Sequence, residues 1–260
     1  MTRSAGRPTS VRNRRWNCRY RSEATLGQVL GEHQGQVQKL EAISLQSVVL
    51  LNRPEGFAFQ PLPREAQLSP AFSVNLADFD GDGLEDIFLS QNFFANQPEV
   101  PRFDAGRGLL LKGDGTGSFR AVPGQESGIF IYGEQRGAAI ADFDGDGRID
   151  LAVGQNSGPT KLFRNRGGRP GLRVHLRGPS GNPSGIGAQL RLHFGERLGA
   201  IREIHAGSGY LSQDSTVTVL STPSSPSALW VRWPGGKVTT TELHGDFKTI
   251  TVDYNGKVVP

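Results

Sequence analysis

One ten-residue stretch of this chain occurs twice, and it restricts the fold more than any other feature of the sequence. The copies are Ala77–Asp86 (ADFDGDGLED) and Ala141–Asp150 (ADFDGDGRID), 64 residues apart. Each has aspartates at positions 1, 3, 5 and 9 of a nine-residue loop and glycines at positions 4 and 6. Glycine permits the positive φ values of a tightly curled loop. Without a cation, clustered aspartates repel by about 1 kcal/mol per close pair in water. The repeat therefore predicts a metal-binding loop that is present twice.

Calcium fits this loop better than magnesium does. Ca²⁺ takes about six to eight oxygen ligands at about 2.3–2.6 Å in irregular geometry, whereas Mg²⁺ prefers a rigid octahedral shell with retained water. Every aspartate of the loop is used as a ligand, so we expect two structural Ca²⁺ sites and no catalytic residue. The predicted ligands are four carboxylates and one backbone carbonyl per loop: Asp78, Asp80, Asp82, Leu84 and Asp86 in the first, and Asp142, Asp144, Asp146, Arg148 and Asp150 in the second.

The sequence around the loops excludes an EF-hand. That motif needs helices on both sides and a bidentate glutamate at position 12. Here position 12 is Leu89 in one copy and Val153 in the other. The flanking segments Phe72–Ala77 and Ile87–Ser90 have the apolar character of strands.

A hairpin pattern follows the first loop and indicates a repeated unit. Leu109–Lys112 and Ser118–Val122 enclose a glycine-rich turn, and Val49–Phe57 and Lys161–Arg169 have a similar arrangement. A period near 60 residues with about four strands is typical of a propeller blade. Two blades and part of a third would leave exposed sheets at both ends, which are prone to self-association.

Composition favours a loop-rich β protein. Hydrophobic residues make up 36% of the 260-residue chain, which also has 35 glycines and 16 prolines, and no apolar run is long enough to span a membrane. The single Cys18 excludes an internal disulfide. Residues 1–22 contain seven arginines and no acid, so the rest of the chain, with 22 basic and 25 acidic residues, is slightly acidic. We expect residues 1–35 to be a basic, disordered segment, and no recognised nucleic-acid module follows it, so we expect no specific nucleic-acid binding.

The last third of the chain, residues 171–260, predicts a second all-β domain after the blades at residues 36–170. Leu172, Val174 and Leu176 alternate with polar residues, as in a half-buried strand. Six further short strands follow, including one at Ala200–Ala206, and seven short strands in so short a segment favour a β-sandwich. No GxSxG or HxxxH pattern occurs in the chain. Nothing in the sequence therefore requires catalysis.

The metal loop and the LLLKGDGTGSF hairpin resemble the FG-GAP or VCBS repeats of calcium-binding β-propellers, the class that includes integrin α-chain heads. The C-terminal motifs at Gly185–Leu190 (GIGAQL), Gly207–Gln213 (GSGYLSQ) and Val231–Val238 (VRWPGGKV) resemble those of an ASPIC/UnbV domain. Together they cover roughly residues 36–255. Such proteins usually carry a closed propeller, typically of seven blades, so we expect this chain to be a fragment or to close by pairing with other chains.

This resemblance implies a fold and a class of function. The fold would be all-β, with a partial propeller of about two to three blades followed by a β-sandwich-like ASPIC/UnbV domain. The function would be a non-enzymatic, secreted or cell-surface binding and adhesion module for a protein or carbohydrate ligand, with Tyr210, Ser212 and Gln213 as its recognition residues. The alternative is a propeller-based enzyme, such as a polysaccharide lyase, or an accessory protein of a biosynthetic pathway.

Overall fold

The computed structural model describes residues 25–38 and 40–260. Contacts divide the chain into two units, Met1–Leu45 and Gln46–Pro260. Both parts predicted for the chain beyond residue 45 lie in the second unit, and their division at residue 170 stays a prediction. The arginine-rich residues 1–24 lie outside the described residues.

The described part of the first unit begins with two short helices. Helix α2 (Leu26–Leu30) begins with a capping box, in which Thr25 Oγ1 accepts the N–H of Gln28 and the Gln28 side chain accepts the N–H of Thr25. The 3₁₀ helix η1 (Gly31–Gln36) follows directly. Residues 37–38 and 40–43 form no strand, and no described strand pairs with them. No described helix is long and apolar enough to cross a membrane.

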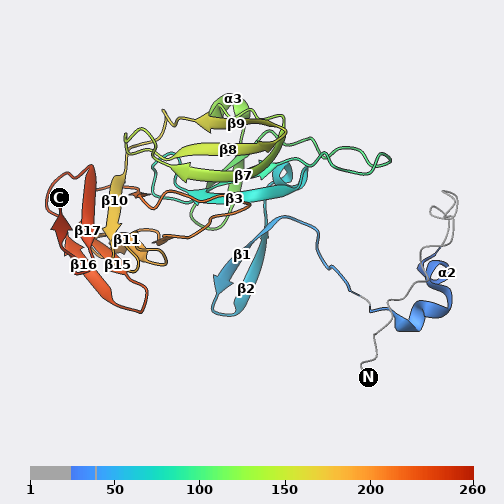
Figure 1. Cartoon of the computed structure of the whole chain (residues 1–260), viewed down its shortest axis with the longest axis horizontal. Coiled ribbons are helices and arrows are strands. Elements are labelled where there is room, and N and C mark those ends of the chain that lie inside the picture. Colours follow the sequence, from blue (N-terminus) through green and yellow to red (C-terminus); the bar gives the residue numbers. More distant parts are fainter. Residues whose placement is uncertain (1–24, 39) are drawn as a thin grey trace, which may run out of the picture. The chain divides into compact units, whose positions relative to one another are not determined.

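The first half of the second unit consists of three small antiparallel sheets (Figure 1). The two-stranded sheet is a ribbon of β1 (Val48–Arg53) and β2 (Gly56–Pro61). The four-stranded sheet contains β3 (Ala71–Ala77), β4 (Asp86–Gln91), β5 (Leu109–Gly113) and β6 (Phe119–Val122). The three-stranded sheet contains β7 (Glu134–Ala141), β8 (Asp150–Asn156) and β9 (Gly158–Phe163). Two short helices, η2 (Arg64–Gln67) and α3 (Gly124–Ser127), lie in the connections.

The two larger sheets repeat one another in register as well as in sequence. Ala77 pairs with Asp86 at the end of β3 and β4, and Ala141 pairs with Asp150 at the same point of β7 and β8. Each carboxylate loop therefore connects the first two strands of a blade. The result is a propeller-like arrangement of small sheets, which confirms the predicted all-β fold with a partial propeller.

Alternation along the strands fills the spaces between the sheets. Ile87 and Leu89 of β4 point to the ribbon side, whereas Phe88 points to the three-stranded sheet. Phe88 packs there with Leu151 and Val153 of β8. Successive side chains of a strand point to opposite faces, so one strand contributes to two cores.

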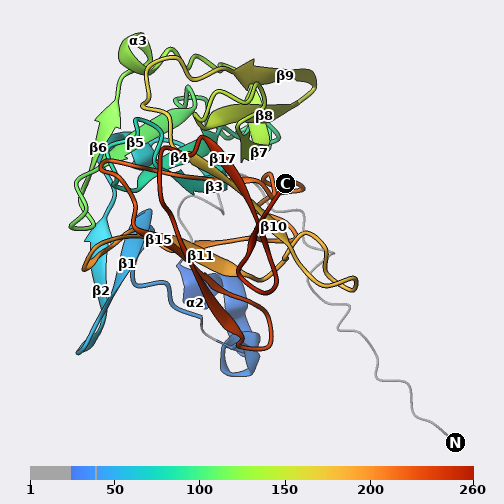
Figure 2. The same ribbon diagram turned by 90° about the vertical axis from the view of Figure 1, so that its left-hand side faces the viewer.

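The second half of the unit is a pair of sheets that enclose one core, beside the stack of blades (Figures 1 and 2). One sheet has the order β14-β10-β17-β18, with β10 (Leu172–Arg177), β14 (Thr218–Leu220), β17 (Thr249–Asp253) and β18 (Val258–Val259). The other has the order β12-β11-β15-β16 with β13 beside β11: β11 (Gln189–Phe194), β12 (Arg197–Leu198), β13 (Arg202–Glu203), β15 (Ala228–Arg232) and β16 (Val238–Glu242).

Trp233 is the largest buried side chain of this sandwich-like core. Its ring packs edge-on against Tyr254 at 5.2 Å between centroids, and its indole N–H donates to Thr239 at 3.1 Å. Trp230 contacts Arg191 instead, and the guanidinium carbon of Arg191 lies 4.9 Å from the centroid of the Trp230 ring. The segment Ala200–Ala206, expected as one strand, forms a strand only over β13, in which Arg202 donates to the Leu76 carbonyl at 3.2 Å.

Candidate metal centres and an adjoining cavity

The first carboxylate loop is curled around the side chain of Asp78. One oxygen of Asp78 accepts the N–H groups of Gly81 at 2.7 Å and Asp82 at 3.1 Å, and the other accepts that of Gly83 at 2.6 Å. Gly81 and Gly83 have φ values of 75° and 92°. These are the two positions at which the sequence predicted a need for glycine.

Asp86 connects this loop to the next strand. It is buried, and its two oxygens accept the N–H of Phe79 and the N–H of Gly113 on β5, both at 3.0 Å. Burial raises the pKa of Asp86 to about 6, although the two N–H groups act in the opposite direction. A nearby cation would therefore favour the ionised form of this carboxyl group.

The second loop reproduces this geometry. Asp142 accepts N–H groups from Gly145 at 2.8 Å, Asp146 at 3.0 Å and Gly147 at 2.8 Å. The two glycines have φ values of 78° and 84°. The backbone of both loops is therefore set by the same aspartate and the same two glycines.

Asp150 has the place that Asp86 has in the first loop. Its carboxylate accepts the N–H of Phe143 at 3.1 Å and the N–H of Asn165 at 2.7 Å. Burial raises the pKa of Asp150, as it does at Asp86. The position-9 aspartate of each loop thus ties its loop to the third strand of the blade or to the segment after it.

Three carboxylates converge in each loop, with oxygens within 4.8 Å of one another. Oxygens around one Ca²⁺ are separated by at most about twice the usual 2.3–2.6 Å bond length, so both groups fit a cation of this size. The carboxylates of the predicted ligands Asp82 and Asp150 are not members of these convergent sets, and the predicted backbone-carbonyl ligands at Leu84 and Arg148 stay a prediction. The convergent sets are Asp78, Asp80 and Asp86 in the first loop, and Asp142, Asp144 and Asp146 in the second.

Basic side chains lie against both groups at corresponding places. Lys112, near the end of β5, forms ion pairs with Asp80 and with Asp82, the latter at 2.9 Å. Arg164, just after β9, forms ion pairs with Asp144 and with Asp146, the latter at 3.6 Å. Hydrogen bonds that Lys112 donates to the two aspartates raise the pKa of Lys112 above its ordinary value. The loops therefore bind internal cations at the oxygens that would hold a metal ion.

Further arginines neutralise the second loop. Arg173 of β10 forms an ion pair with Asp142 at 2.8 Å, and Arg148 forms one with Asp146 at 2.9 Å. Arg148 was predicted to contribute its carbonyl, and its side chain adds positive charge to the same loop.

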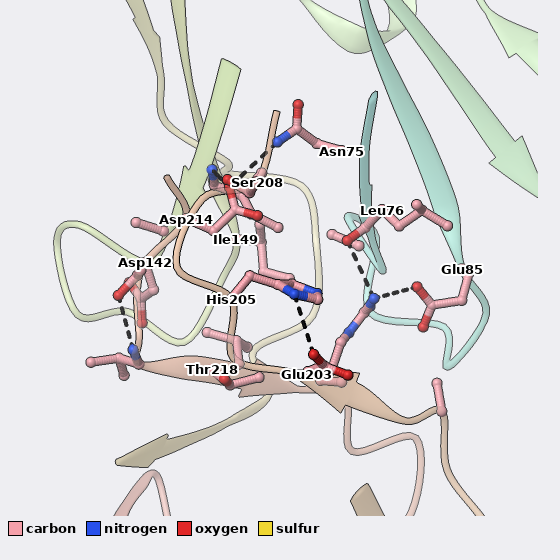
Figure 3. Close-up of a pocket in the computed structure, with 18 of the residues that line it drawn as sticks. Asn75, Leu76, Glu85, Asp142, Ile149, Glu203, His205, Ser208, Asp214 and Thr218 are labelled. Carbon is pink, nitrogen blue, oxygen red and sulfur yellow. Dashed lines mark hydrogen bonds and ion pairs between the residues drawn. The ribbon is translucent and has the colours of Figure 1, made fainter. Parts of the chain in front are cut away.

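A cavity of about 790 Å³ lies between the first strands of the two blades and the C-terminal sheets (Figure 3). Val74 and Leu76 of β3 and Ile140 of β7 supply apolar wall. The segment from Gly207 to Val219 closes the opposite side. Asp142 of the second loop borders the cavity, so a carboxylate loop and the cavity adjoin.

Asp214 is the carboxylate that both blades hold in this cavity. One of its oxygens accepts the N–H of Ile140 at 2.8 Å and the side-chain amide of Asn75 at 3.4 Å. Burial raises the pKa of Asp214, while these hydrogen bonds, one from Ser208 and the charge of His205 act against the rise. Figure 3 shows Asp214 directed toward Asn75 and Ser208.

An ion pair and a contact between a carboxylate and an imidazole also line the cavity (Figure 3). Arg202 is 2.5 Å from Glu85, and Glu203 is 3.6 Å from His205. Burial raises the pKa of Glu85, and the charge of Arg202 and its hydrogen bond oppose the rise. The cavity therefore combines apolar walls with carboxylates at several points, which is typical of a small-ligand site.

The predicted recognition residues lie where the C-terminal half contacts the blades. Gly137 of β7 faces the carbonyl of Tyr210, and Gly209 faces Ser73 of β3. The Tyr210 ring is half-exposed and lies edge-on to Phe72 at 6.0 Å between centroids. The Ser212 hydroxyl is buried and Gln213 is exposed. The structure thus brings Tyr210 and Ser212 to a junction within the molecule.

Sequence reasoning missed a buried ionic group beside this junction. The Arg136 guanidinium lies 4.0 Å from the Phe72 ring centroid and 2.7 Å from Glu134. Glu134 also accepts the N–H of Phe94 at 2.7 Å and the amide of Asn156 at 2.5 Å. No periodic pattern marks these residues. In contrast, Lys112 and Arg164 are basic residues at matching places of the two hairpins, and a comparison of the repeats would have found them.

Comparison with known proteins identifies the C-terminal region. Residues 178–258 match the family described as ASPIC and UnbV. This span contains the three motifs on which the resemblance to that domain was based.

Curated relatives match a larger part of the chain. Cartilage acidic protein 1 of Xenopus tropicalis is 29% identical over 178 residues, which are 66% of this chain and 27% of that protein. Cartilage acidic protein 1 of Homo sapiens is 28% identical over 187 residues, 68% of this chain and 27% of that protein. The chain thus spans about a quarter of the length of the curated relatives that it matches.

Proposed function

We propose that this chain is a non-enzymatic binding module, stabilised by calcium, that works outside the cell or at its surface. Similarity to cartilage acidic protein 1 supports the extracellular setting, and the match to ASPIC and UnbV supports a function shared with such modules. In this proposal the metal holds the blades and the ligand binds elsewhere.

The observation that carries the proposal is the repeated convergence of three carboxylates at equivalent corners of two blades. Asp86 bonds to Gly113, and Asp150 bonds to Asn165. A metal ion at the first corner would therefore fix the first two strands of that blade to the third. Bound Ca²⁺ would supply positive charge at these carboxylates, and the protein groups would supply the rigid frame.

The cavity supports recognition as the second part of the function. Its volume of about 790 Å³ suits a ligand of several heavy atoms or a side chain from a partner. Its walls come from the blades and from the ASPIC and UnbV region together, so both halves would contribute to specificity. The ligand class in this proposal is a protein or a carbohydrate.

A calcium titration tests the metal part. Binding to the native state alone raises stability by RT ln(1 + [L]/Kd), about 2.7 kcal/mol at a hundredfold excess over Kd for each site. We expect the melting temperature of the full chain to rise with calcium and to fall with a chelator. The variants Asp80→Asn and Asp144→Asn should each remove part of the rise, whereas Asp246→Asn, an exposed aspartate of a distant loop, should not. A melting temperature independent of calcium would refute the metal part.

A binding screen tests the recognition part and the enzymatic alternative together. Calcium-loaded chain would be applied to a glycan array and to extracellular matrix proteins, and the same sample assayed with polysaccharide lyase and hydrolase substrates. We expect saturable binding without turnover. Turnover that is lost in Asp214→Asn would instead support the enzyme.

A further inference from the structure

The small sheets of this molecule pack face to face, so each apolar face needs a neighbour. Strands β4 and β5 are covered on both sides. On one side Ile87, Leu89 and Leu111 pack with Val49 of the β1–β2 ribbon and with the segment that follows the ribbon. On the other side Phe88, which is fully buried, packs against the β7–β9 sheet. These two contacts show how this chain stacks its own sheets.

The outer face of the ribbon is apolar and has no neighbour in the described structure. Leu50 pairs with Phe59, and Phe57 lies beyond Phe59 on the same face of the ribbon. Leu50 is 50% exposed, Phe57 is 67% exposed and Phe59 is 63% exposed. Single exposed apolar side chains are normal on a protein surface, but a contiguous group of three large ones marks an interaction site.

The outer face of the β7–β9 sheet is hollow, and residues 210–216 border the hollow. Ala139, Ala152 and Leu162 form a row across its three strands, since Ala152 pairs with both of the others. Leu162 is 58% exposed, and Phe143, in the loop between β7 and β8, is 53% exposed. A cavity of about 500 Å³ lies over this row, bordered by residues 213–216.

Comparison of the two blades shows what is missing at this face. Ala152 is equivalent to Phe88, 64 residues earlier, and Phe143 is equivalent to Phe79. Phe88 and Phe79 pack against the next sheet, whereas Phe143 remains exposed. The β7–β9 face therefore has small residues where its counterpart has a large one, and it can accept large residues from outside.

We propose that these two faces bind each other between copies of this chain: Leu50, Phe57 and Phe59 of one copy pack into the hollow at Ala139, Ala152 and Leu162 of the next. The ribbon then continues the same stack that it already begins within its own chain. The contact joins two different surfaces, so it is heterologous and forms rings or open chains of copies. This interface does not depend on calcium or on the ligand of the cavity.

Sedimentation velocity of the full chain over a wide range of concentration tests the interface. We expect reversible association that continues beyond a dimer. The double variant Phe57→Gln/Phe59→Gln and, separately, Leu162→Arg should each raise the concentration of half-association at least about tenfold. The control is Phe247→Gln, an exposed aromatic of the C-terminal region, which should associate as the unchanged chain does. Circular dichroism of each variant monitors the fold.

A mixing experiment identifies the two surfaces. The ribbon variant keeps an intact β7–β9 face, and Leu162→Arg keeps an intact ribbon. Each variant should be monomeric alone, and the mixture should form a one-to-one dimer that grows no further. An unchanged chain that stays monomeric throughout would overturn the proposal. Dimers of Leu162→Arg alone would do so too, because they would show that ribbons pair with ribbons.

Discussion

The ammonium group of Lys112 lies 2.9 Å from the carboxylate of Asp82, inside the first carboxylate loop. It also contacts Asp80, one of the three residues whose oxygens converge. Arg164 makes the equivalent contacts in the second loop. A metal ion would need the same oxygens, so these side chains and the metal compete.

Lys112→Met should strengthen calcium binding at the first loop. The variant removes a competing cation and one positive charge. Because the ion pair is partly exposed, we expect a severalfold lower Kd for calcium, in line with about 1 kcal/mol for such a pair. Isothermal titration gives the constant. The control is Lys161→Met, which replaces an exposed lysine of β9 in the second blade. Weaker calcium binding in Lys112→Met would show that the lysine assists the metal.

Without calcium the same variant should be less stable than the unchanged chain. Asp80 and Asp82 then repel Asp78 and each other with no cation between them. Chemical denaturation with a chelator present measures this difference, and adding calcium should reverse its sign.

Glu134→Gln should lower the free energy of unfolding and change its dependence on pH. Burial alone would raise the pKa of Glu134, but hydrogen bonds from Phe94, Asn156 and Arg136 lower it to about 2. A carboxylate with a depressed pKa adds stability above its unfolded pKa, about 4.5, which is lost as the pH falls toward about 2. Glutamine keeps an acceptor but removes the charge beside Arg136.

We expect a loss of about 1–3 kcal/mol at neutral pH, because a charged hydrogen-bond partner is removed from a buried site. Denaturant titrations from neutral to acid pH measure it. The difference between the two proteins should shrink below the unfolded pKa. A difference that stays constant across this range would mean that the charge of Glu134 is not responsible. Glu242→Gln, an exposed glutamate of β16, is the matched control.

Gly137→Ala should separate the C-terminal half from the blades. An added Cβ on Gly137 would clash with the backbone carbonyl of Tyr210, which cannot move as freely as a side chain. Overpacking of this kind costs typically about 1–3 kcal/mol. We expect a lower melting temperature and a more exposed Tyr210, read from its fluorescence quenching. Gly167→Ala has open space around the new methyl group and should leave both unchanged.

Local pattern predicted much of this fold because its strands and loops are set by near neighbours. The alternation of Leu172, Val174 and Leu176 predicted strand β10 with one buried face, and all three are buried. The loops followed from their own aspartates and glycines, since Asp78 accepts N–H groups from Gly81, Asp82 and Gly83 of its own loop. Such features need no knowledge of distant parts of the chain.

The cavity could not be predicted in this way. Asp214 accepts hydrogen bonds from Ile140 and Asn75, which lie far away in the sequence. No local sequence pattern specifies that these residues come together. The motif GSGYLSQ indicated a recognition loop, yet its Tyr210 carbonyl lies against Gly137 of a blade. Spacing and composition predict strands and turns, but they do not predict which surfaces of the blades and of the C-terminal half contact each other.

Asp214 allows a test of whether the ionisation of a buried carboxyl group lowers or raises the free energy of unfolding. Burial raises the pKa of this carboxyl in the folded state. The folded protein therefore holds the proton more tightly than the unfolded chain does, and stability falls as the pH rises from the unfolded value, 3.8, through the raised folded value. Asp214→Asn removes the ionisation but keeps a carbonyl that can accept the N–H of Ile140.

We therefore expect Asp214→Asn to be at least as stable as the unchanged chain at neutral pH, with the difference shrinking below pH 3.8. Asp214→Ala lacks the acceptor, leaves the Ile140 N–H unpaired, and should lose about 1–3 kcal/mol at every pH. Denaturant titrations of the three proteins across this range, without calcium, distinguish the two effects. If the unchanged chain gains stability over Asp214→Asn as the pH rises, then the donors around Asp214 outweigh its burial and the direction inferred for its pKa is wrong.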